Sequence, residues 1–78
     1  MLALSRKWIR KLIAKPETGM GYHIVSVVLK DGRRFDQAIV DSGFITRIKG
    51  MDSIPFSEAD ISKIIVTHAS WDFQNDSG

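Results

Sequence analysis

Apolar and polar residues alternate on both sides of the pair Asp31-Gly32, in the middle of the chain. The segment before the pair, 22–30, is rich in β-branched residues, and alternation resumes over 34–40. An Asp-Gly pair between two alternating runs is the strongest short-range signal for a β-hairpin. The pattern therefore predicts two antiparallel strands joined by a tight turn.

The parity of the apolar positions predicts the length of this turn. Core-type residues fall on odd positions in both strands: Val25, Val27, Leu29, Phe35 and Ile39. A two-residue loop pairs odd with even positions, whereas a three-residue loop with a left-handed glycine pairs odd with odd. We therefore predict a type I turn with a bulge at Gly32. Polar Gln37 on the odd side, with Ile24, Val28 and Val40 on the even side, departs from this parity and indicates a partly covered second face.

The first 15 residues have helical periodicity. Ser5 is a candidate N-cap, and the apolar residues that follow it recur at helical spacing until Pro16 ends the segment. We predict an amphipathic helix within residues 5–15. Its polar face is basic, which fits either a helix docked on the core or an interfacial helix. Docking is favoured, because an isolated helix of this length is marginal in water.

Further elements follow the hairpin. The turn Asp41-Ser42-Gly43 predicts a third strand over 44–49, Ser57 and Asp60 resemble the ends of a capped helical turn, and 61–68 has strand composition. In the tail we expect the aromatic side chains to dock and residues 74–78 to fray. The expected fold is α+β: an N-terminal helix packed on a small, strongly bent antiparallel sheet, or a partly open barrel of four to five strands.

Composition limits the class of protein. With 78 residues the chain is expected to form a single domain, 1–78, with a β-rich part over 22–68. It has no cysteine, so disulfides and thiolate zinc sites are excluded. The N-terminus lacks the order of a secretory signal, and no apolar run approaches the roughly 20 residues that span a bilayer. A cytoplasmic location is the expectation.

Charge is sorted along the chain although the net charge is only +2. Residues 1–15 sum to +5, residues 16–49 to +1 and residues 50–78 to −4. Such asymmetry is typical of a basic arm for nucleic acid or membrane. The alternative is that the two ends of the chain lie close together and neutralise one another.

The order of elements resembles small bacterial Sm-like and SH3-like barrels. Val25, Val27, Leu29, Gly32 and Phe35 match the first Sm-like motif, and the layout of a helix before a barrel with an Asp-Gly hairpin is similar to the small bacterial Rho-inhibitor proteins. The later glycine of the motif is replaced by Gln37 and Ala38, and the turn lacks the asparagine of an Sm RNA pocket. The resemblance implies a shared architecture, which hosts many functions.

Catalytic and metal chemistry finds little support. His23 and His68 lack the further ligands at the spacing that a metal site needs. Ser57, Asp60 and His68 supply the residue types of a triad, but no nucleophile elbow surrounds the serine, and capping explains it. We expect a non-enzymatic protein without cofactor or metal.

The expected function is an interaction module that binds a protein partner or a second copy of itself. The alternatives are a nucleic-acid-binding Sm-like protein that uses the basic helix and the hairpin turn, and a peripheral protein of the membrane surface. Aromatic and arginine side chains dominate interfaces, and cations contact phosphates. The candidate surface comprises Arg6, Lys7, Trp8, Arg10, Lys11, Arg33, Arg34, Arg47 and Trp71.

Overall fold

The computed structural model describes residues 1–69, which form one α-helix, one 3₁₀ turn and five strands. The α-helix is α1 (Arg6–Ile13) and the 3₁₀ turn is η1 (Glu58–Asp60). The strands are β1 (Leu2–Ala3), β2 (Tyr22–Leu29), β3 (Arg34–Asp41), β4 (Phe44–Ile48) and β5 (Ile61–Val66). Each predicted element is present, and β1 is an additional short strand.

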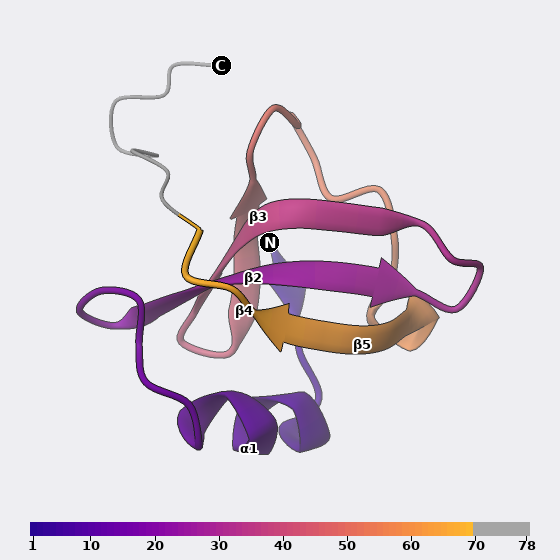
Figure 1. Cartoon of the computed structure of the whole chain (residues 1–78). Coiled ribbons are helices and arrows are strands. Elements are labelled where there is room, and N and C mark those ends of the chain that lie inside the picture. The colour runs from indigo at the N-terminus through magenta and orange to yellow at the C-terminus, as the bar shows by residue number, and fades with distance from the viewer. Residues whose placement is uncertain (70–78) are drawn as a thin grey trace.

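The five strands form one antiparallel sheet in the order β1-β4-β3-β2-β5. The sheet curls strongly into a half-barrel, and α1 packs against one of its faces (Figure 1). This confirms the expected α+β class and the bent, partly open barrel. Strands β1 and β5 are the two edges of the sheet.

The hairpin of β2 and β3 has the predicted three-residue loop. Val27 stands opposite Phe35, and Val28 stands opposite Arg34. The next pair in this register is Leu29 with Arg33, which leaves residues 30–32 as the three-residue loop. The N–H of Leu29 donates to the Arg33 carbonyl (2.8 Å). Gly32 has φ +93°, the left-handed conformation that glycine adopts without steric cost.

A bulge in β3 changes which residues face the helix. The pairing of β2 with β3 shifts by one residue around Ser26, and Gln37 takes φ 54° there. Beyond this point Ala38 and Val40 join the core beneath α1, while Ile39 faces the opposite side. The prediction that odd parity extends to Ile39 was therefore wrong, because an extra residue reverses the side on which later residues point. Gln37 thus adopts the left-handed conformation that favours glycine.

Two hydrophobic clusters lie on the two faces of the sheet. The smaller one contains Ile24 and Ile39, with Tyr22 and Ala69 packed against them. The larger one lies between α1 and the sheet, and its buried members are Leu4, Trp8, Leu12, Val25, Val27, Leu29, Ala38, Val40, Ile45, Ile48, Phe56 and Ile61. The helix is therefore docked on the core, as favoured from its sequence.

Candidate interaction surface

The C-terminal end of α1 is anchored to the sheet by a buried histidine. His23 on β2 is 7% exposed, and its Nε2–H donates to the Lys15 carbonyl (3.1 Å). The following connection is held by Thr18, whose hydroxyl accepts from the Ile24 N–H (2.8 Å) and hydrogen-bonds to Nδ1 of His68 (2.6 Å). These contacts fix the position of the helix end relative to both β2 and the chain beyond β5.

A groove separates α1 from β5. It has a volume of about 430 Å³ and is lined by Lys11, Leu12, Ala14, Lys15 and residues 64–66. A second groove, of about 400 Å³, lies on the other side of α1, between the helix and the β3–β4 turn. Of these two grooves, the one beside β5 borders an edge strand of the sheet, so it combines apolar and cationic side chains with main-chain groups.

The outer edge of β5 carries main-chain groups that do not bond to β2. The Thr67 N–H donates to the Ile24 carbonyl (3.1 Å), so every second residue before it, Ile65 and Lys63, faces β2. Ile64 and Val66 lie between these positions, and their N–H and C=O groups point away from the sheet. Within residues 1–69 no strand pairs with this edge, and an edge of this kind is a template for pairing with another chain.

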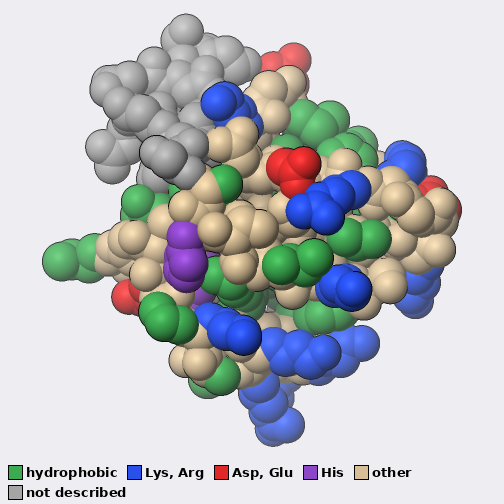
Figure 2. Space-filling view, viewed as in Figure 1, with side chains coloured by type: hydrophobic (Ala, Val, Ile, Leu, Met, Phe, Trp, Pro, Cys, Tyr) green, Lys and Arg blue, Asp and Glu red, His purple; other side chains and the backbone are tan. Residues whose placement is uncertain are grey.

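The exposed face of α1 is cationic. Arg6, Lys7, Arg10 and Lys11 are all exposed, and Lys and Arg side chains gather over the helix in Figure 2. Trp8 lies on the opposite, docked face and is only 4% exposed. Among the candidate residues from the sequence, these four cations share one surface, whereas Trp8 belongs to the core.

Two lysines cover the ring of Trp8. The Nζ atoms of Lys7 and Lys11 lie 4.7 and 5.1 Å from its ring centroid. A cation at this distance over an indole ring is attracted by its negative face. The tryptophan therefore positions two of the surface cations and is not itself open to a partner.

The helix cations have no carboxylate partner within residues 1–69. The ion pairs of this part of the chain join Arg33 to Asp31 and Arg34 to Asp36, both at 2.8 Å. A carboxylate contacts the residue before the helix, where the Ser5 N–H donates to Oε1 of Glu58 (3.4 Å). Neutralisation of the basic helix by acidic residues is thus not found in the described part of the chain.

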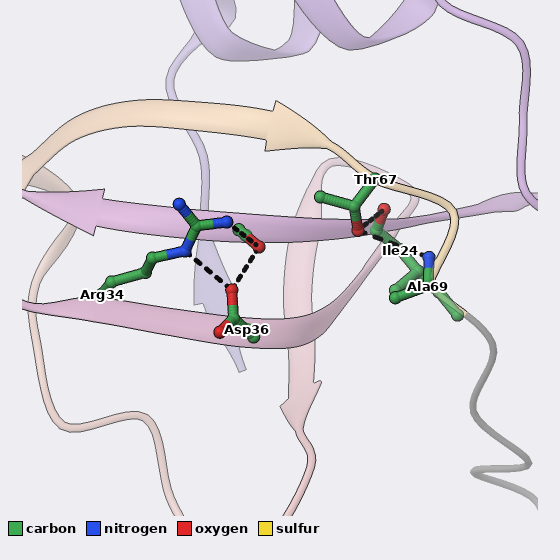
Figure 3. Close-up of polar contacts among 6 residues, drawn as sticks. Ile24, Arg34, Asp36, Thr67 and Ala69 are labelled. Carbon is green, nitrogen blue, oxygen red and sulfur yellow. Dashed lines mark hydrogen bonds and ion pairs between the residues drawn. The ribbon is translucent and has the colours of Figure 1, made fainter.

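The hairpin arginines are held by neighbouring carboxylates. Asp31 accepts from both the main-chain N–H and the Nε–H of Arg33, and these bonds lower the pKa of the Asp31 carboxyl. Asp36 accepts from the Ser26 hydroxyl (2.6 Å) and from Arg34, which lowers the pKa of the Asp36 carboxyl (Figure 3). Arg33 and Arg34 are therefore locally compensated, unlike the cations of α1.

One further predicted candidate lies away from this surface, and another falls outside the described residues. Arg47 is half-buried on β4, where its pairing with Ile39 puts it on the face of the sheet away from α1. Trp71 and residues 74–78, for which docking and fraying were expected, lie outside the described residues. Among the described candidates, Arg6, Lys7, Arg10 and Lys11 therefore share one surface, whereas Arg47 lies on the other face of the sheet.

The three residues considered for a catalytic triad, Ser57, Asp60 and His68, form hydrogen bonds that stabilise the fold. Ser57 donates from both its N–H and its hydroxyl to the Asp60 carboxylate, which caps η1 as predicted, and these bonds lower the pKa of Asp60. His68 bonds to Thr18 instead of to Ser57. Within residues 1–69 no three acidic, histidine or cysteine side chains gather in a group suited to a metal ion. That same part of the chain holds no helix of the length and apolar character needed to cross a membrane.

No family model, curated protein or solved structure matches this chain. What the structure adds to the resemblance to Sm-like barrels is the curled five-stranded sheet and its element order.

Sequence reasoning missed two parts of the groove. Lys15 follows the helix and was not included in the candidate surface, and Ile64 and Val66 were treated only as strand residues. The position of β5 at an edge depends on the strand order, which local sequence patterns do not encode. The sequence pointed to this part of the groove only through its charge. Four of the six residues 6–11 are lysine or arginine, and a fifth cation, Lys15, stands just before Pro16.

Proposed function

We propose that this chain is a non-enzymatic module that binds an extended segment of a protein partner along the outer edge of β5. One observation carries the proposal: the outward main-chain groups of Ile64 and Val66 lie beside a groove of about 430 Å³. Added strands obtain affinity from main-chain hydrogen bonds and specificity from side-chain pockets next to the edge. The β5 edge offers both.

The side chains of β5 and the neighbouring helix α1 both fit the addition of a strand at this edge. The side chains of Ile64 and Val66 pack against the large core on the side of α1. A strand added beside them places its alternate side chains into the groove, against Leu12 and Ala14. The helix therefore acts as one wall of the binding site, and its anchoring through His23 keeps that wall in place.

Amide hydrogen exchange tests whether the edge is free. In the isolated chain the amides of Ile64 and Val66 are expected to exchange rapidly, whereas the amide of Ile65, bonded to β2, is expected to be protected. Equal protection at all three positions in a monomeric sample would show that the edge is already occupied and would contradict the proposal.

A displayed library of random ten-residue peptides then tests binding. Retained peptides are expected to protect the amides of Ile64 and Val66, and N-methylation at alternate peptide positions is expected to abolish binding because it removes the donors to the edge. N-methylation at the intervening positions is the matched control and is expected to have little effect. Recovery of no peptide above background, or binding that leaves both amides unprotected, would refute the function.

The cationic face of α1 favours a second candidate function, the binding of nucleic acid. Its support is the set of exposed cations without a carboxylate partner in residues 1–69. Phosphate contacts make affinity fall steeply with salt. A mixed-sequence oligonucleotide is therefore expected to bind at 50 mM salt and to lose affinity at 200 mM. The variant Arg6→Gln/Arg10→Gln is expected to weaken binding more than Arg33→Gln, and no binding at low salt removes this candidate.

A further inference from the structure

We infer that the segment bound at the β5 edge is acidic at the positions that face α1. This inference rests on the proposed function and adds the chemistry of the partner. The structural basis is the charge of the groove, whose two lining lysines, Lys11 and Lys15, have no carboxylate partner in residues 1–69.

The register of an added strand places its side chains relative to these lysines. In an antiparallel pair, residues directly opposite each other point to the same side of the sheet. Residues opposite Ile64 and Val66 therefore point toward α1, into the groove lined by Lys11 and Lys15. The residue between them points to the other face, where the side chain of Ile65, which pairs with Ser26 on β2, provides an apolar neighbour. The expected segment thus carries carboxylates at alternate positions with an apolar residue between them.

A third cation makes the edge positive on its other side as well. Lys63 is exposed on β5 and stands opposite Val28, which places it on the face away from α1. Pairing of β5 with β5 of a second copy about a two-fold axis would bring both sets of lysines together. Like charges that are brought close together repel one another, so an acidic partner is favoured over a second copy of this chain.

The experiment uses the full chain and the peptides retained by it from the random library. Asp and Glu are expected to be enriched at alternate positions of those peptides. Replacing these residues by Asn and Gln is expected to weaken binding by about threefold to tenfold at low salt, as for one or two partly exposed ion pairs. The protein variant Lys11→Gln/Lys15→Gln is expected to cause a similar loss for the acidic peptide only.

The matched control is Lys30→Gln/Lys49→Gln, which removes two exposed lysines that do not line the groove and is expected to change affinity by less than about twofold. Retained peptides that protect Ile64 and Val66 but show no acidic preference would overturn this inference and leave the proposed function standing. Failure to retain any peptide refutes the function itself. Concentration-dependent dimers that protect the same two amides without peptide would identify a second copy as the occupant and overturn the inference.

Discussion

The two faces of β2 differ in how they are covered. On the side of α1, Val25, Val27 and Leu29 are at most 2% exposed and lie in the large apolar cluster. On the other side, Ile24 lies in a small cluster, and next to it Ser26 joins a polar network with Asp36. One face is thus closed by a helix, while the other is closed by short side-chain contacts across the sheet.

The difference shows how a small domain obtains a core from a curled sheet. The helix-facing side receives residues from α1 and from every strand, because the sheet bends around it. Among residues 1–69, the small cluster of the outer side consists of Ile24 and Ile39, with Tyr22 and Ala69 packed against them. We therefore expect substitutions on the helix-facing side to have the larger effects on stability.

The largest expected effect tests this comparison directly. Leu29→Ala is expected to lower the free energy of unfolding by about 2–5 kcal/mol, since it removes buried methyl groups from a closely packed core. Ile24→Ala, which is equally buried, is expected to fall at the lower end of that range because its small cluster can collapse more readily. Urea denaturation of both variants measures the difference. A larger loss for Ile24→Ala would reverse our ranking of the two faces.

The hairpin illustrates what the sequence determines. The odd parity of Val27, Leu29 and Phe35 correctly predicted the three-residue loop, because register and side-chain direction are linked by a period of two. The sequence indicated the bulge only indirectly, because polar Gln37 occupies an odd position and apolar Val40 an even one. Glutamine has no preference for positive φ. The residue type at position 37 therefore does not predict that the side chains after it point to opposite sides from those expected.

The candidate surface was predictable to a smaller extent. Helical periodicity identified the exposed cations of α1 and the residues that dock. It did not determine whether Trp8 was core or contact residue, because both interpretations place an aromatic on an apolar stripe. The groove beside β5 combines residues more than 45 positions apart, Lys15 and Ile64 among them. Such proximity follows from the strand order and not from any local pattern.

Substitution of Gly32 is expected to have the next largest effect on stability. It tests the loop that sets the register of β2 against β3 and so decides which residues lie on each face. Gly32→Val is expected to cost about 1–3 kcal/mol, because a β-branched residue is strained at positive φ. Gly32→Asn is the matched control and is expected to cost less, since asparagine tolerates this conformation. Apart from its two chain neighbours, no atom of residues 1–69 lies within 4 Å of a Cβ added at Gly32, so contact with other parts of the described chain does not contribute. Thermal unfolding compares the two, and equal melting temperatures would contradict a left-handed Gly32.

At the bulge, replacing Gln37 by glycine is expected to have a smaller effect on stability than the substitutions above, and to raise stability where they lower it. Gln37→Gly is expected to stabilise the chain by up to about 1 kcal/mol through relief of the positive φ, less any contribution of the lost side chain. Gln37→Val is expected to destabilise it, because valine strongly disfavours this conformation. Denaturant unfolding of the pair sharpens the comparison, since the bulge is what moves Ile39 to the outer face. A Val variant as stable as the Gly variant would argue against the bulge.

The polar network of the outer face gives the smallest expected effect, and it depends on pH. Hydrogen bonds from Ser26 and Arg34 hold the pKa of Asp36 below its usual 3.8. A carboxyl whose pKa is lower in the folded state contributes stability that is present above the unfolded pKa and is lost as pH falls through the folded value. Asp31 and Asp60, whose pKa values are also lowered, contribute in the same direction.

The free energy of unfolding is therefore expected to decline as the pH falls below about 4, and Asp36→Asn is expected to make this decline shallower. Asp52→Asn is the control, because Asp52 is exposed and has no hydrogen-bond or ion-pair partner in residues 1–69. Since Asp36 and Arg34 are both more than half exposed, salt is expected to reduce the Arg34 contribution and to leave the bond from Ser26. Urea denaturation at several pH values and two salt concentrations separates the two donors. A slope that Asp36→Asn leaves unchanged would show that the outer face depends on the Ile24 cluster alone.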